Sequence, residues 1–508
     1  MSLKSGVYNK KKPYKKSSYN MKSIITTFKS IKGKDCLLSS SLHKQINVAN
    51  ENYFPLGSLL SRELNRNDLG KEVGSINYVS GSNFFFTKTK ALQAFSFLPI
   101  LNSESTESIM PQAFVDHNLK AGDIILSKDS NIGETVILDK DYPNYMLSGA
   151  LYKLPLNEFD KFYILAFIKH RYFREQLNRL VPKGATLRHA GTKFLDCNIP
   201  FPVNNRDAII NHVSNITRKI VEIEIEIKKR DSEINDIIET ELVNNQKSNS
   251  VYNFTHATYS KLTIGKRLDT GVYSDTFQRI THLLTNYKGG VFYVDADKLR
   301  SGSTPKIRDI SNYSEGCLRW ITPTNCSDWG FIQTHEKIST PTKNNLNEDA
   351  VLLINRTSRG GKGEYVGIGT FYDYNTYGDG HHNQGIYRIT GYSKELLVFI
   401  TTFMNTKMMR KYCSALSVGS KMKEIKSEQF LSIPIPVLDS KVLKRVYKLF
   451  YTEDFDRSIE NILSLQTHNV GLFHLSVAES ILTQYLNSVL DMIIDNIDFN
   501  IVNNRIIK

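Results

Sequence analysis

The stretch RDAIINHVSNITRKIVEIEIEIKKRDSEINDIIETELV, residues 206–243, contains neither proline nor glycine. Its apolar residues recur at alternating intervals of four and three. They are Ile209, Val213, Ile216, Ile220, Ile223, Ile227, Ile234 and Ile237, and Arg230 fills the one gap. This heptad seam predicts a long helix that packs in a coiled coil. At about 1.5 Å per residue, such a helix is roughly 57 Å long.

A strand is the competing interpretation of the middle of this stretch. Val221-Glu-Ile-Glu-Ile-Glu-Ile227 alternates apolar and acidic residues with period two, as a half-buried strand does. The flanking residues keep the heptad, however, and no turn residue interrupts them. We therefore favour the helix.

The chain carries the same landmarks on both sides of the predicted helix. On one side lie Asp123-Ile-Ile-Leu-Ser-Lys128, Lys183-Gly-Ala-Thr-Leu-Arg188 and Ile199-Pro-Phe-Pro202. On the other lie Asp349-Ala-Val-Leu-Leu-Ile354, Val418-Gly-Ser-Lys-Met-Lys423 and Ile433-Pro-Ile-Pro436. Their order and spacing recur even where the identities differ. This predicts two copies of one module that share a fold.

Each copy combines strand and helix signals, so the fold class is α+β. In the first copy, short apolar runs at 124–126 and 134–138 predict strands, and a helical pattern follows at 158–179. The second copy repeats this order, with strands expected near 350–355 and 365–369 and a helix near 393–412.

A second helical region follows the second copy. Apolar residues at helical spacing occur in 442–450, 459–463 and 482–494, and Gly471 breaks the run. We expect this region to pack antiparallel against the first helix, because a coiled-coil face needs a partner. The resulting domain boundaries are a basic, disordered tail at 1–50, a first globular domain at 51–205, a first long helix at 206–245, a second globular domain at 250–437 and a second helical region at 438–508.

The 508 residues carry a net charge of +14, which points toward a polyanionic partner. Residues 1–50 alone hold eleven lysines and one acid, Asp35. Two interpretations of this tail remain open, a solubilising extension and an arm that binds phosphates without reading sequence. No apolar run is long enough to span a bilayer and no secretory signal is visible, so we expect a cytoplasmic protein with no membrane partner.

The composition offers no enzyme motif. Five scattered cysteines give neither a zinc pattern nor a disulfide framework. Gly360-Gly-Lys-Gly363 lacks the spacing of a phosphate-binding loop, and His381-His382 is better interpreted as part of a hairpin loop than as a metal site. A methyltransferase would need a glycine-rich loop for its methyl donor and an Asn-Pro-Pro-Tyr type string, and neither occurs. We expect no cofactor and no catalytic residue.

Polar loop residues at matched places in both copies are candidates for DNA contact, because arginine can fork onto guanine and lysine meets phosphate. In the first copy they are Lys128, Lys183, Thr186, Arg188, His189 and Lys193, and in the second Arg356, Arg359, Lys362, Lys421, Lys423 and Lys426. A solvated surface cation is the competing interpretation for any one of them.

The order of module, helix, module, helix, with these strings, resembles the specificity (S) subunit of type I restriction-modification systems over roughly residues 50–470. The resemblance rests on Gly122–Lys128, Lys183–Thr186, Arg267-Leu-Asp269, Gly302-Ser-Thr-Pro305 and the two Ile-Pro-X-Pro strings. The basic tail and residues 470–508 depart from the family pattern.

The resemblance implies a non-catalytic subunit whose two target-recognition domains bind a bipartite sequence in double-stranded DNA. It further implies partnership with two methyltransferase (modification) subunits and optionally with restriction/translocase subunits. Two alternatives stay open: a specificity subunit of a methylase-only or other phage-defence complex, and a protein-interaction scaffold that does not bind DNA.

Overall fold

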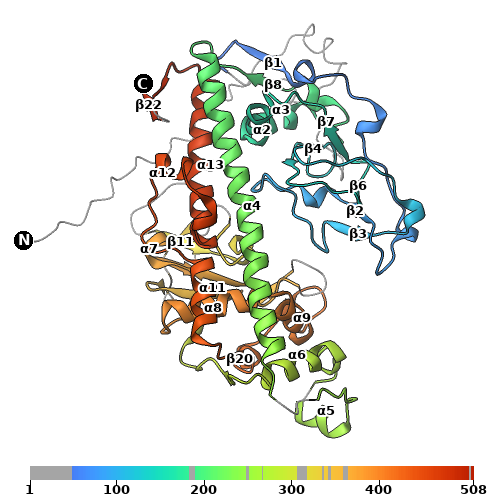
Figure 1. Cartoon of the computed structure of the whole chain (residues 1–508), viewed down its shortest axis with the longest axis vertical. Helices are drawn as coiled ribbons and strands as arrows, with labels where there is room; N and C mark the ends of the chain where they lie inside the picture. The colour runs from blue at the N-terminus through green and yellow to red at the C-terminus, as the bar shows by residue number, and fades with distance from the viewer. Residues whose placement is uncertain are drawn as a thin grey trace, which may run out of the picture. The chain divides into compact units, whose positions relative to one another are not determined.

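The structure is a computed structural model that describes residues 48–181, 189–247, 251–265, 267–305, 317–333, 337–340, 342, 345–358, 364–502 and 505–507. The chain divides into two compact units (Figure 1). Unit 1 comprises Met1–Val221 together with Leu482–Lys508, and unit 2 comprises Glu222–Ile481. Each unit therefore contains one copy of the repeated module and a part of each helical region.

Within its described residues, the first module contains three small sheets and two α-helices. Its strands are β1 (Tyr53–Pro55), β2 (Phe85–Thr87), β3 (Thr106–Ser108), β4 (Ile124–Ser127), β5 (Thr135–Ile137), β6 (Tyr145–Leu147), β7 (Leu151–Leu154) and β8 (Asn198–Pro200). Its helices are α2 (Lys161–Lys169) and α3 (Arg171–Leu180), and a 3-10 turn, η7, covers Lys193–Asp196. The sheets have the orders β5-β4-β7, β3-β2-β6 and β1-β8. Every described pairing in them is antiparallel except β2 with β6.

The second module repeats this plan with additional strands. Its strands are β9 (Val291–Phe292), β10 (Leu299–Ser301), β11 (Leu318–Ile321), β12 (Lys337–Ser339), β13 (Asn345–Leu346), β14 (Ala350–Ile354), β15 (Arg356–Thr357), β16 (Gly369–Tyr372), β17 (Gly380–His382), β18 (Ile386–Ile389), β19 (Lys423–Glu424) and β20 (Ile435–Pro436). Its helices are α5 (Tyr259–Gly265), α6 (Asp275–Thr285), α7 (Tyr374–Tyr377), α8 (Lys394–Asn405), α9 (Lys407–Leu416) and α10 (Ser427–Leu431).

The two modules have equivalent topology. Strand β14 lies between β16 and β18 as β4 lies between β5 and β7, and all four pairings are antiparallel. The parallel pairing of β11 with β17 repeats that of β2 with β6. In both modules the strand that carries the Ile-Pro motif pairs with an early strand, β8 with β1 and β20 with β9. The prediction of two α+β modules with one fold is confirmed.

Both modules bury a core behind their central strand. In the first, Ile125, Val136 and Leu151 belong to one buried cluster. In the second, Leu352 and Ile354 pack with Tyr372. The apolar runs that identified the strands in the sequence are thus the residues that form the cores.

A helix break recurs at the same place in both modules. We expected one helix at 158–179 and one near 393–412, and each of these predictions is wrong in this detail. His170 ends α2, and its Nδ1 accepts a hydrogen bond from the Tyr172 backbone N–H at 3.3 Å. Thr406 ends α8, and its Oγ1 accepts one from Met409 at 3.2 Å. Each side chain caps the next helix, so the chain turns between two short helices.

Two further predictions in the second module are wrong. The strand expected at 365–369 begins only at Gly369, because residues 364–367 form a turn whose Tyr365 and Val366 are buried. His381 and His382 lie in the fully buried strand β17 and not in a hairpin loop. Burial underlies both errors. A segment that is buried on both faces does not alternate apolar and polar residues, so its sequence does not distinguish a buried strand from a buried turn.

The long helix is α4 (Arg206–Asn244), and the second helical region forms α11 (Ser440–Phe450), α12 (Ile459–Leu463) and α13 (Leu472–Ile494). The short strands β21 (Asn500–Val502) and β22 (Arg505–Ile507) follow. The predicted seam is buried from Ile209 to Ile234. Its last member is not Ile237, which is half-buried, but Ile238, which is fully buried. A straight helix of 3.6 residues per turn drifts in this way relative to a 3.5-residue repeat.

Helix pairing is antiparallel within each unit. In unit 1 the His212 ring nitrogen Nε2 lies 3.0 Å from the Tyr485 hydroxyl, and Asn205 contacts Asn500. In unit 2 Thr467 donates to Glu222 at 3.0 Å, and Arg445 donates to Glu233 at 3.2 Å. In both units, of the two residues taken from Asn205 and α4, the later one contacts the earlier residue of the C-terminal region. The predicted antiparallel packing is confirmed.

Candidate nucleic-acid interface

In both modules, the segment that leaves the central strand pairs with the segment that follows the second helix. In the first module Asp129 bridges to His189, and the Ala190 backbone N–H donates to the Lys128 carbonyl at 2.9 Å. In the second, β15 pairs with β19. The Ile425 N–H then donates to the Asn355 carbonyl at 2.9 Å. The backbone therefore brings two of the predicted polar loops together in each copy.

A charged cluster stands on this pairing in the first module. The Asp129 carboxylate lies 2.8 Å from His189 Nδ1, and its other oxygen contacts the Lys128 ammonium. The Asp129 side chain is 13% exposed, whereas that of His189 is 65% exposed. Asp129 therefore positions two cationic or hydrogen-bonding groups from segments 60 residues apart, and the imidazole remains accessible to a ligand.

The loop under this cluster is closed by its own hydrogen bonds. Ser127 Oγ donates to the Asp129 carbonyl at 2.8 Å. The Gly133 N–H donates to the Ser127 carbonyl at 2.8 Å. Gly133 has a φ of +80°, and a Cβ there would lie 2.9 Å from Leu177. A glycine is needed at this turn, and it seats the loop against α3.

The second module presents a different set of side chains at the equivalent place. Arg356 lies opposite Glu424 and Thr357 lies opposite Lys423 in the β15–β19 register. Both Arg356 and Lys423 are half-buried. Opposite charges directly across an antiparallel pair attract each other, so this register places Glu424 where it favours the positive charge of Arg356.

A tight turn carries the exposed lysine of this segment. Gly419 has a φ of +102°, and a Cβ there would lie 2.2 Å from the Met422 carbonyl oxygen. Glycine is therefore required for the turn that leads to Lys421, which is exposed. Lys426 is also exposed and precedes α10. Their ammonium groups can reach a phosphate without first leaving a buried position.

The remaining predicted residues fall into two groups. Lys193 donates to the Leu180 carbonyl at 3.2 Å, so it stabilises the end of α3. Five predicted residues lie outside the described part of the chain: Lys183, Thr186, Arg188, Arg359 and Lys362. Their assignment to DNA contact stays a prediction.

Two site residues were missing from the sequence-based set, Asp129 and Glu424. Both are acidic, and a search for groups that contact DNA selects cations. Asp129 follows Lys128 directly, but its second partner, His189, becomes its neighbour only through the fold. Only the pairing of the two segments brings these acidic residues beside the predicted cations.

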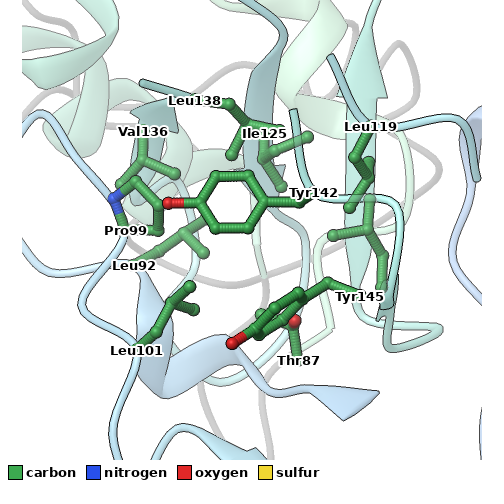
Figure 2. A pocket seen from close by; sticks show the side chains of 11 residues that line it. Thr87, Leu92, Pro99, Leu101, Leu119, Ile125, Val136, Leu138, Tyr142 and Tyr145 are labelled. Atoms are coloured by element: carbon green, nitrogen blue, oxygen red, sulfur yellow. The ribbon is translucent and has the colours of Figure 1, made fainter. Parts of the chain in front are cut away.

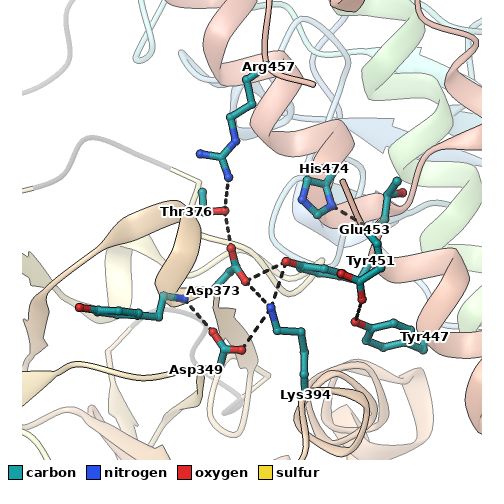
Figure 3. A network of polar contacts seen from close by, with 11 residues as sticks. Asp349, Asp373, Thr376, Lys394, Tyr447, Tyr451, Glu453, Arg457 and His474 are labelled. Carbon is teal, nitrogen blue, oxygen red and sulfur yellow. Dashed lines mark hydrogen bonds and ion pairs between the residues drawn. The ribbon is translucent and has the colours of Figure 1, made fainter. Parts of the chain in front are cut away.

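A buried polar network fixes the second module to the helical region of unit 2 (Figure 3). The Lys394 ammonium lies 3.0 Å from Asp373, 3.2 Å from Asp349 and 3.1 Å from the Tyr451 hydroxyl. Tyr451 also donates to Asp373 at 3.0 Å. Thr376 completes the set by donating to Asp373 and accepting from Arg457 at 2.8 Å.

The charges of this network stabilise each other. Burial alone would raise the pKa of Asp373, but hydrogen bonds from Thr376 and Lys394 hold that pKa below its ordinary value. Burial would likewise lower the pKa of Lys394, yet Tyr451 and Asp373 raise it. Both groups stay ionised, and α8 is thereby tied to the segment that follows α11.

The cavity in the first module is not suited to a polar ligand. Its volume is about 20 Å³, and it is lined chiefly by apolar side chains, among them Ile125 and Val136; the Tyr142 ring lies across the middle of the view with Tyr145 below it (Figure 2). The Tyr142 hydroxyl already donates to Asp139 at 2.7 Å. An apolar space of this size is a small packing gap in the core, with room for no more than about one water molecule.

The described residues contain no group of three metal-binding side chains. The four cysteines among them, Cys197, Cys317, Cys326 and Cys413, are buried and form no disulfide with one another. No helix in this part of the chain has the length and apolar character needed to cross a bilayer.

Comparison with known proteins gave matches among solved structures only. No protein-family model matches the chain. No curated protein matches it either. Among solved structures, the type I restriction-modification S subunit of M. genitalium matches 89% of this chain and 97% of its own, at 12% identity and a TM-score of 0.37.

Two further structures cover similar shares. One comes from work on complex assembly and conformational transition of the type I R-M system, with 10% identity, a TM-score of 0.27 and coverage of 89% of this chain and 99% of its own. The HsdS subunit of Thermoanaerobacter tengcongensis has 10% identity and a TM-score of 0.26, over 87% of this chain and 96% of its own.

Proposed function

We propose that this chain is the specificity subunit of a type I restriction-modification system, and that its two modules read the two halves of a bipartite DNA target. The observation that carries the proposal is the repeated segment pairing. One scaffold presents Lys128 and His189 in the first module, and the same scaffold presents Arg356 and Lys423 in the second. Recognition of two different half-sites requires one backbone arrangement that carries different polar side chains in each module, and the duplicated pairing provides this.

The chemistry of these groups suits duplex DNA. Arg356 can donate two parallel hydrogen bonds to guanine, and an imidazole such as His189 can donate to or accept from a base edge. The exposed Lys421 and Lys426 suit phosphate oxygens, which position a protein without reading sequence. The proposed recognition domains are residues 51–205 and 250–437, joined by the long helix.

In this proposal the chain carries no catalytic group and no cofactor, and it directs other subunits to DNA. Two methyltransferase subunits are the proposed partners, and restriction/translocase subunits are optional. Two half-sites held by one chain bind as a bivalent target, so the second contact benefits from a raised effective concentration. A subunit that serves a methylase alone would use the same DNA-reading surface.

The direct test is methylation profiling. DNA from cells that express this chain with a type I methyltransferase subunit would be sequenced by a single-molecule method and compared with DNA from cells that lack the chain. The proposal expects a new motif of two short specific blocks around a fixed non-specific gap. A methyltransferase that is active and bound to the chain but yields no such motif would contradict it and favour the protein-interaction scaffold.

A further inference from the structure

Helix α11 carries an unusual concentration of positive charge. Its eleven residues contain Lys441, Lys444, Arg445 and Lys448 and no acidic residue. Residues 51–508 have a net charge of only +4, which is the charge of this single helix. A surface helix of ordinary composition would mix both signs, so this face is selectively cationic.

The basic residues line one groove within unit 2. The groove has a volume of about 630 Å³ and lies against α4. It is lined by Arg230, Lys441, Lys444, Arg445, Lys448, Leu449, His468 and Asn469. None of the described residues that line it is acidic. The neighbouring groove on α4, by contrast, includes Glu233, Asp236 and Glu241.

The fold orients the lysines outward. Val446 and Phe450 are fully buried on the opposite face of α11, and the Phe450 ring packs edge-on against Phe371 of the second module. Lys441, Lys444 and Lys448 follow one another at intervals of three and four, so they share one face of the helix, and all three are exposed. The face is rigid because its other side belongs to the core of the unit.

The charge of the three lysines is available to a ligand. Arg230 and Arg445 are partly neutralised, since Arg230 lies 3.1 Å from Glu226 and Arg445 lies 3.2 Å from Glu233. Among the residues that the structure describes, the three lysines form no ion pair. The arginines therefore belong to the helix packing, and the lysines remain to meet an outside anion.

We propose that the Lys441–Lys444–Lys448 face of α11 is a sequence-independent binding site for the phosphate backbone of duplex DNA, in addition to the two reading modules. From Lys441 to Lys448 the helix rises about 10.5 Å. One DNA strand presents a phosphate about every 3.4 Å along its axis, so this rise corresponds to roughly three phosphate steps. The inference rests on the proposed function, because it assigns a second surface for the same DNA.

The test compares the salt dependence of DNA binding for full-length variants. The probe is a fluorescein-labelled duplex of random sequence, beside a second duplex with the methylated motif. The logarithm of the affinity falls linearly with the logarithm of the salt concentration. Replacing Lys441, Lys444 and Lys448 together by Gln should make this negative slope shallower by about two to three. The affinity should fall by the same factor on both duplexes, because phosphate contacts carry no sequence information.

Two control variants test whether a change in the salt slope comes from the α11 lysines themselves. They exclude a general loss of positive charge and a loss of folding as its cause. Replacing Lys288, Lys407 and Lys411 by Gln removes the same charge from exposed positions of unit 2 and should leave the slope near that of the wild type. Replacing the three α11 lysines by Arg keeps the charge and should retain the slope. An equal loss in the Lys288, Lys407 and Lys411 variant would contradict a specific α11 site.

The outcomes also distinguish the two proposals. Wild-type protein that does not bind duplex DNA would overturn both. Wild-type binding with an unchanged slope in the α11 variant would overturn this inference alone. If that variant binds DNA normally but no longer copurifies with its methyltransferase subunit, the face binds an acidic protein surface and not DNA.

Discussion

The Arg171 guanidinium donates from one nitrogen to both carboxylate oxygens of Asp491, at 2.9 Å each. His170 Nε2 lies 3.4 Å from the same carboxylate. The helix-capping break between α2 and α3 thus also supplies the residues that bind the C-terminal end of α13 in unit 1. Burial alone would raise the pKa of Asp491, but the hydrogen bonds from His170 and Arg171 hold it below the ordinary value.

Replacing Asp491 by Asn should destabilise unit 1 by about 1 kcal/mol at neutral pH, a modest value because the Arg171 side chain is half exposed. A carboxyl group with a lowered pKa in the folded state stabilises the protein above its unfolded pKa, and this stabilisation is lost as the pH falls through the folded pKa. The variant should therefore lose less stability than the wild type below about pH 4. Urea unfolding at several pH values measures both effects.

Asp495 provides the matched control one helical turn away. Its pKa is raised, first by burial and then by the negative charge of Asp491. Because its charge is disfavoured in the folded state, Asp495→Asn should be neutral or slightly stabilising. Equal destabilisation by the two variants would show that the Arg171 contact has no special weight.

Replacing Lys394 by Met should destabilise unit 2 by about 3–5 kcal/mol, because the Asp373 carboxylate would stay buried without its cation. Lys298→Met is the control. Lys298 pairs with Asp295 at 3.2 Å, but that carboxylate is 58% exposed, so the cost should stay within about 1 kcal/mol. Chemical denaturation of both variants tests the difference, and similar losses would argue against the network as an anchor.

The stability of unit 2 should fall as the solution is acidified from about pH 6.5 to pH 4. Burial lowers the pKa of His474 to about 4 and that of His382 to about 3. The unfolded chain binds these protons near pH 6.5, so acid favours unfolding in that window. His474→Gln keeps a hydrogen-bond acceptor for Thr452 but cannot titrate, and should flatten the profile. A profile parallel to that of the wild type would contradict the assignment.

Site variants should alter one half of the methylation motif at a time. Lys128→Gln with His189→Gln should relax the block read by the first module, and Arg356→Ala with Lys423→Gln the other block. The loss should be about 1–3 kcal/mol of discrimination for a base contact. Lys193→Gln, which removes a contact within the scaffold, should lower stability without changing the motif. Motif sequencing distinguishes these outcomes, and simultaneous change of both blocks would contradict the assignment of one module to each.

Replacing Gly471 by Ala should destabilise the start of α13 by about 1–3 kcal/mol. A Cβ at this position would lie 2.6 Å from the backbone of Phe450 and Tyr451. Gly74→Ala is the control, because its nearest atom would be 3.9 Å away, and it should be neutral or stabilising. Thermal unfolding compares them, and equal melting temperatures would mean that the backbone at 450–451 yields without cost.

The parts of the fold that the sequence predicted correctly depend on local periodicity. The heptad of α4, the strand at Ile124 and the break at Gly471 each follow from residues close in sequence. The helix breaks at His170 and Thr406 were missed because a capping side chain is also compatible with a continuous helix. Strand β17 was missed because two buried histidines carry no apolar alternation.

The candidate site shows the same division. The sequence identified the loops that contain Lys128 and Arg356, because those loops recur at matched places. It could not place Asp129 beside His189 or Glu424 opposite Arg356, since each of these pairings joins segments that are at least 60 residues apart. The duplication therefore indicates from the sequence which loops form the candidate surface. The arrangement of the charges on that surface depends on tertiary contacts, which the sequence does not reveal.

The division of α4 between the two units has a consequence for biosynthesis. Unit 2 is one continuous segment, Glu222–Ile481, whereas unit 1 needs residues 482–508 to complete its helix pair. Ribosomes add on the order of 5–20 residues per second, so the first module waits for tens of seconds after its own synthesis. The unit whose synthesis begins first is thus completed last, and its part of α4 leaves the ribosome with its apolar seam uncovered.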